Sequence, residues 1–139
     1  MNQGYNAYKT ANVDTADRGK LLVICYDVAI TRGNTVVDMG ECDYKRIEER
    51  NKHLYKMNDA IGILISSLNF DVGDGSIARN LYSIYEYMQY RINQAIIHNE
   101  TESIREILGY LTELREAWKV AAQNVRISSS GNYNNAAAI

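Results

Sequence analysis

The most constraining feature of this sequence is a stretch near its C-terminal end in which apolar residues alternate at spacings of three and four. This spacing places every apolar side chain on one stripe of an α-helix and is typical of helices that pack against other helices. The stripe consists of Ile104, Ile107, Leu111, Leu114, Trp118, Ala121 and Val125. Because partner helices are needed to cover such a stripe, the stretch predicts a helical bundle.

Three further segments have helical spacing of apolar residues, and the chain has no proline to interrupt them. The expected helices span residues 17–39, 43–68, 76–98 and 100–124. No segment has a convincing strand pattern. The sequence therefore predicts an all-α fold, an antiparallel four-helix bundle within residues 17–125. Residues 1–16 are expected to form an N-terminal arm, which could include a short extra helix, and residues 126–139 a disordered tail.

Several local features qualify this outline. The middle of the first helix is weak, because Gly33 and its polar neighbours are poor helix formers, and the sequence leaves open whether the helix is continuous there. The charged start of the second helix, which includes Arg50, should be solvated on most sides. Its apolar end, residues 61–68, should be buried on several faces or offered to a partner. Asn99, followed three residues later by Glu102, predicts the N-terminal cap of the last helix.

Charge and hydropathy exclude several classes of function. A net charge of −2 and a pI near 5.7 do not indicate the basic surface that nucleic-acid-binding proteins use. The longest apolar runs are too short to span a bilayer, and no apolar stretch near the start predicts a signal peptide. We therefore expect a cytoplasmic protein. Its two cysteines, Cys25 and Cys42, are too few for a disulfide framework and should be reduced.

No constellation of residues predicts catalysis. The histidines, His53 and His98, lack partners at metal-ligand spacing. The sequence from Asp71 to Gly75 resembles a calcium loop, but Tyr82 stands where the bidentate glutamate is required. No glycine-rich phosphate loop and no activated nucleophile is present. We expect no enzyme activity, no metal and no cofactor.

Tyrosine is unusually frequent, with eleven residues against one phenylalanine and one tryptophan. Within nine residues of the third expected helix lie Tyr82, Tyr85, Tyr87 and Tyr90. They cannot all face one core, because Leu81, Ile84 and Met88 are expected to occupy it. For any one of them, packing at the flank of the bundle with the hydroxyl in water is the simpler interpretation. The set together favours a groove for a partner, because an exposed aromatic patch usually has a function.

Three motifs, together with the paired tyrosines of the arm, carry a resemblance to a known family. They are Cys25-Tyr26-Asp27-Val28-Ala29-Ile30, Tyr85-Glu86-Tyr87-Met88-Gln89-Tyr90-Arg91, and Leu114-Arg115-Glu116-Ala117-Trp118-Lys119. In order and spacing they resemble the FliS family of flagellin export chaperones over nearly the whole chain. One departure is Arg18, which stands where the family usually has proline.

The resemblance implies a monomeric cytoplasmic chaperone that binds the disordered C-terminal segment of flagellin, blocks its polymerisation and delivers it to the flagellar type III export apparatus. Further partners would be the export gate or flagellar regulatory proteins. The side chains expected to contact the client are Tyr5, Tyr8, Met57, Ile61, Ile65, Leu68, Tyr82 and Tyr85. Tyr5 and Tyr8 either contact the client directly or cover its groove until the client arrives.

Two alternatives remain at this point. One is a helical adaptor or regulator of secretion whose client is not flagellin. The other is a structural helical oligomer, suggested by the heptad spacing of the second and fourth helices. Binding to purified flagellin tests the first alternative, and the oligomeric state in solution tests the second.

Overall fold

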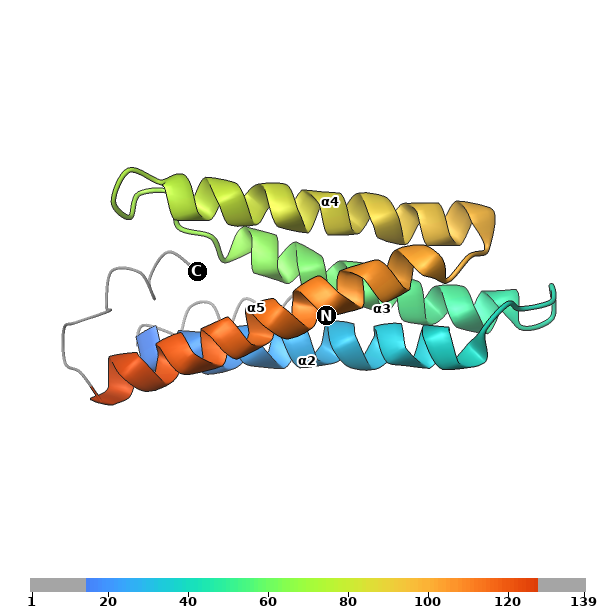
Figure 1. Ribbon diagram of the computed structural model, residues 1–139, viewed down its shortest axis with the longest axis horizontal. Coiled ribbons are helices and arrows are strands. Elements are labelled where there is room, and N and C mark those ends of the chain that lie inside the picture. The colour runs from blue at the N-terminus through green and yellow to red at the C-terminus, as the bar shows by residue number, and fades with distance from the viewer. Residues whose placement is uncertain (1–14, 128–139) are drawn as a thin grey trace, which may run out of the picture.

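The computed structural model describes residues 15–127, and within them the fold is a four-helix bundle (Figure 1). Its helices are α2 (Thr15–Met39), α3 (Ile47–Ser66), α4 (Ser76–His98) and α5 (Glu102–Ile127). Each helix runs antiparallel to the one before it, and both α2 and α4 pack against α3 and α5. The predicted all-α bundle is confirmed. The expected arm and tail lie almost entirely outside the described residues.

One apolar core joins all four helices. Each helix buries a stripe at spacings of three and four residues, as the sequence predicts. The largest contributors are Leu22, Tyr26, Leu54, Met57, Ile61, Leu64, Tyr85, Met88, Ile92, Ile104, Ile107, Leu111 and Trp118, each at most 2% exposed. None of the described helices combines the length and apolar character needed to cross a bilayer.

The first helix is unbroken at Gly33, because α2 is continuous from Thr15 to Met39. A Cβ atom at Gly33 would lie 2.7 Å from Leu108 Cδ2 and 3.0 Å from Met57 Cε. The glycine thus lets α2 approach α5 and α3 closely. Packing outweighs the cost of about 1 kcal/mol that glycine brings to a helix interior.

The turn between α4 and α5 differs from the expected cap. Asn99 ends α4 in the left-handed conformation, with φ at 51°. The carboxylate of Glu100 instead accepts hydrogen bonds from the backbone N–H of Ser103 at 2.8 Å and from its hydroxyl at 2.5 Å. Burial alone would raise the pKa of Glu100. The hydrogen bonds from Ser103 and the nearby arginines lower it by more, so the pKa lies below its usual value.

Arg50 departs most from its expected setting, because it is fully buried beneath this turn. Its guanidinium donates to the carbonyl oxygen of Ala95 at 3.1 Å and to that of Glu100. Burial lowers the pKa of the Arg50 guanidinium. The side chain thus ties the last turn of α4 to the connection that follows it, through one carbonyl oxygen in each.

Gly75 provides a stability prediction. It precedes α4 with φ at 79°, and a Cβ there would lie 2.7 Å from the carbonyl oxygen of Phe70. We expect Gly75→Ala to lower the free energy of unfolding by about 1–3 kcal/mol, since both the conformation and the clash are unfavourable. Gly73→Ala is the matched control, because Gly73 also has positive φ but no atom within 4 Å of its Cβ position. If urea unfolding shows that both substitutions lower the free energy of unfolding equally, the clash with Phe70 does not contribute.

Candidate functional site: an apolar groove between α4 and α5

A groove opens between α4 and α5 because the two helices diverge. The helix α5 begins beside the C-terminal end of α4 and then runs obliquely away from it across the bundle (Figure 1). The hollow has a volume of about 570 Å³. It is lined by Ser83, Ile84, Tyr87, Tyr110, Glu113, Leu114 and Ala117.

The walls of the groove are apolar side chains that reach solvent. Ile84 is 38% exposed, Tyr87 41% and Tyr110 43%. Leu114 is partly buried and packs against the core from the floor of the groove. A concave surface of this kind suits an amphipathic helix that presents its apolar face.

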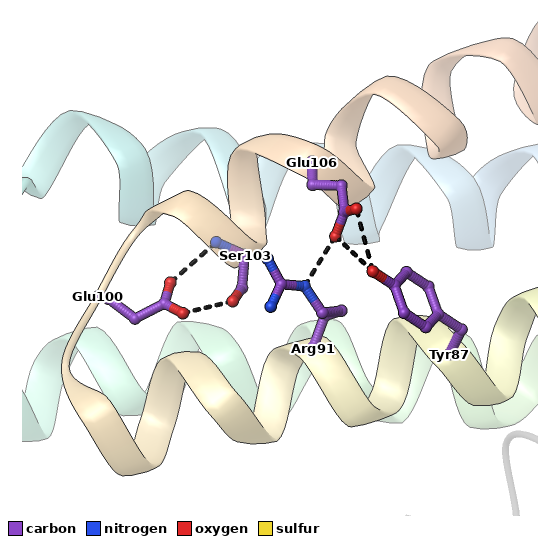
Figure 2. Close-up of polar contacts among 5 residues, drawn as sticks. All are labelled: Tyr87, Arg91, Glu100, Ser103 and Glu106. Atoms are coloured by element: carbon purple, nitrogen blue, oxygen red, sulfur yellow. Dashed lines mark hydrogen bonds and ion pairs between the residues drawn. The ribbon is translucent and has the colours of Figure 1, made fainter.

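A polar cluster borders the groove toward the α4–α5 turn (Figure 2). Glu106 on α5 accepts hydrogen bonds from the Tyr87 hydroxyl at 2.9 Å and from Arg91 Nε at 2.7 Å. The hydrogen bond to Glu106 is the main reason why the pKa of Tyr87 is raised. The cluster fixes the ring of Tyr87 as a wall of the groove and joins the two helices where they are still close.

A second, smaller hollow of about 360 Å³ lies along the outer face of α2, where Ile24 and Val28 are exposed. Asp27, which also lines it, pairs with Arg115 Nε of α5 at 2.5 Å. This hollow is more polar than the α4–α5 groove, since Asp27, Arg32 and two threonines contribute to its lining. It therefore presents less apolar surface to a partner.

The structure places three of the expected client contacts inside the core. Met57 and Ile61 are 0% exposed and Tyr85 is 1% exposed, so they offer no surface to a partner while the bundle is folded. The hydroxyl of Tyr85 does not reach water but forms a hydrogen bond with that of Tyr26. Burial raises the pKa of Tyr85 to about 12.

The remaining expected contacts lie elsewhere. Ile65 and Leu68 are partly buried at the end of α3 and after it, and Tyr82 is 38% exposed. The ring of Tyr82 lies edge-on to that of Phe70, with the centroids 6.3 Å apart. Tyr5 and Tyr8 fall outside the described residues. Among the six expected residues within residues 15–127, Tyr82 is thus the most exposed, though it is not part of the groove lining.

Sequence reasoning missed the α5 wall and gave Ile84 to the core. A signal for the α5 wall was present, because Tyr110, Leu114, Ala117 and Ala121 recur at spacings of four, three and four. This second stripe lies beside the seam that contains Leu111 and Trp118 and overlaps with it at Leu114 and Ala121. Its members Tyr110, Leu114 and Ala117 line the groove. Within residues 15–127, no three histidine, cysteine, aspartate or glutamate side chains come together as a metal site requires.

Comparison with known proteins finds a family and several relatives that match most of the chain. A family model described as "Flagellar protein FliS" matches residues 1–125. The chain is 31% identical over 128 residues to the flagellar secretion chaperone FliS of Bacillus subtilis, covering 92% of each chain. It is 29% identical over 126 residues to the protein of that name in Salmonella typhimurium, covering 84% of this chain and 87% of the relative. A third relative of that name, from Vibrio cholerae, is 29% identical over 125 residues, which is 85% of this chain and 88% of the relative.

Proposed function

The chain belongs to the FliS family of flagellar secretion chaperones, and we propose that its client is flagellin, held by its C-terminal segment in the groove between α4 and α5. The observation that carries this proposal is the exposure of Ile84, Tyr87 and Tyr110 around one apolar hollow. Large apolar side chains gathered in this way are costly to leave in water without a partner.

Binding alone is sufficient for the chaperone activity. A client segment that is disordered when free can fold into an amphipathic helix in the groove and lay its extended parts over neighbouring surface. The ordering cost of a few kcal/mol keeps the complex reversible, so that the client can be released for export. While bound, the segment cannot take part in polymerisation. No catalytic step is needed.

Other contacts of the client are proposals of the same kind. Tyr82 and Phe70, with the partly buried Ile65 and Leu68 nearby in sequence, offer a second apolar point at the α3–α4 connection. Tyr5 and Tyr8 either contact the client or cover the groove in its absence. We further propose that the protein acts in the cytoplasm as a monomer and passes flagellin to the export apparatus.

The test is a substitution in the groove. Ile84→Asp places a carboxylate on the apolar wall, and we expect flagellin to bind at least about tenfold more weakly, because the charge loses water without gaining a partner. Ile97→Asp is the matched control, since Ile97 is 70% exposed on the same helix and does not line the groove. Titration calorimetry with flagellin measures both variants.

The same calorimetry identifies the binding mode and the client segment. Burial of apolar surface predicts a negative heat-capacity change and little loss of affinity as salt rises. Flagellin that lacks its C-terminal segment should not bind. Full affinity of Ile84→Asp for flagellin would exclude this groove, and full affinity of the chaperone for the truncated flagellin would exclude the segment.

A further inference from the structure

Glu113 differs from the other side chains of the groove, because it is the one charged residue in the lining described above. It is exposed, and the described part of the chain provides no ion pair for it. Two other carboxylates of α5 are already engaged. Glu106 pairs with Arg91 at 2.7 Å, and Glu116 pairs with Arg115 at 3.0 Å.

The neighbouring arginines are committed elsewhere. Arg91 is held by Glu106 at the border of the groove. The guanidinium of Arg115 reaches Asp27 of α2 at 2.5 Å. Neither arginine is paired with Glu113, so the carboxylate is open to a cation of a bound partner.

Occupation of the groove changes the energy of this carboxylate. In the empty protein Glu113 is hydrated, but a helix packed against Ile84 and Leu114 would remove part of its water. A carboxylate that loses water without gaining a partner opposes binding, whereas one that meets a lysine or arginine does not. A partner helix that lacks a cation would therefore bind more weakly, because it would leave the Glu113 carboxylate partly dehydrated and unpaired.

We propose that Glu113 selects the docking helix of the client by charge, through an ion pair with a lysine or arginine on the flank of that helix. This inference rests on the proposed function and names the chemistry of the partner. The docking helix would carry apolar residues at spacings of three and four, for contact with Ile84, Tyr110 and Leu114. Its cation would lie beside that stripe, where it meets α5.

The test uses a purified C-terminal fragment of flagellin as the probe. Glu113→Lys should weaken binding by about tenfold or more at low salt, because it replaces attraction by repulsion in a partly desolvated site. Glu113→Gln should weaken it less, since the amide retains hydrogen-bonding capacity. Glu116→Lys is the matched control, three residues away on the same helix and paired with Arg115 instead of lining the groove. It should bind the fragment with nearly parental affinity.

Charge reversal in the probe completes the test. Among fragments in which single lysines or arginines are changed to glutamate, one should bind Glu113→Lys more tightly than it binds the parent chaperone. Parental affinity of Glu113→Lys together with weak binding by Ile84→Asp would overturn the charge selection but leave the groove in place. Parental affinity of both variants would overturn the groove itself. If Glu113→Lys and Glu116→Lys weaken binding of the fragment equally, the effect comes from net charge alone. That result would also overturn the proposal that Glu113 selects the client helix.

Discussion

Replacement of Trp118 by alanine is expected to lower the free energy of unfolding by about 3–5 kcal/mol, because the indole is 2% exposed at the centre of the α5 stripe. The truncation leaves a cavity and removes the interaction of the indole with the buried hydroxyls of Tyr26 and Tyr85. For a domain of this size the melting temperature should fall by roughly 10 °C or more.

The control for this substitution lies two residues along the same helix. Val120 is 53% exposed, so Val120→Ala should change the free energy of unfolding by no more than about 0.5 kcal/mol. Thermal and urea unfolding followed by helical circular dichroism measure both. If Trp118→Ala melts within a few degrees of the parent protein, this face of α5 does not form the core.

Truncation of Arg50 to alanine is expected to cost about as much, roughly 3–5 kcal/mol, for a different reason. The substitution removes the hydrogen bonds that the guanidinium donates to the carbonyl oxygens of Ala95 and Glu100, and it leaves a cavity where the long side chain lay. Arg50→Lys should recover only part of the loss, because a single ammonium group cannot reproduce the two-armed donation of the guanidinium.

Arg46→Ala is the matched control for Arg50, since it removes the same charge from an exposed position four residues earlier. It should alter stability by no more than about 0.5 kcal/mol. Urea unfolding at low and high salt separates the two arginines further, because a buried hydrogen-bonded cation is only weakly screened. A similar small effect for both would show that Arg50 does not support the α4–α5 turn.

The helical periodicity of the sequence was sufficient to predict the bundle. The limits of the third helix, residues 76–98, agree with α4, and the a/d stripe correctly placed Trp118 in the core. Period and capping are local properties, so a single chain contains them directly. The family likeness came from motifs spread over three helices and is confirmed by the match over residues 1–125.

The groove could not be predicted in the same way, because it depends on how two helices diverge in space. Periodicity identified an apolar side of each helix but not which edge of that side remains uncovered. Met57 and Ile61 were therefore assigned to a client surface, whereas α2 and α4 cover them on either side of α3. Ile84 was assigned to the core, whereas the oblique course of α5 leaves it 38% exposed.

Two other differences arose from tertiary contacts that outweigh local tendencies. Gly33 is a poor helix former, yet its missing side chain is what allows Leu108 of α5 to approach α2. Arg50 lies in a strongly charged stretch, yet it is buried and donates hydrogen bonds to carbonyl groups distant in sequence. In both cases the deciding partner lies more than 40 residues away along the chain.

The buried hydroxyl pair of Tyr26 and Tyr85 has a consequence for how this sequence can drift over generations. Phenylalanine at one position alone would leave the other hydroxyl without its tyrosine partner in the core, and phenylalanine at both would leave the buried Trp118 indole without the two hydroxyls that it interacts with. The effects of substitutions at these two positions are therefore coupled, although α2 and α4 lie at opposite corners of the bundle. Each step toward an apolar core therefore leaves a polar group of this cluster without a partner, and this cost favours the retention of both tyrosines.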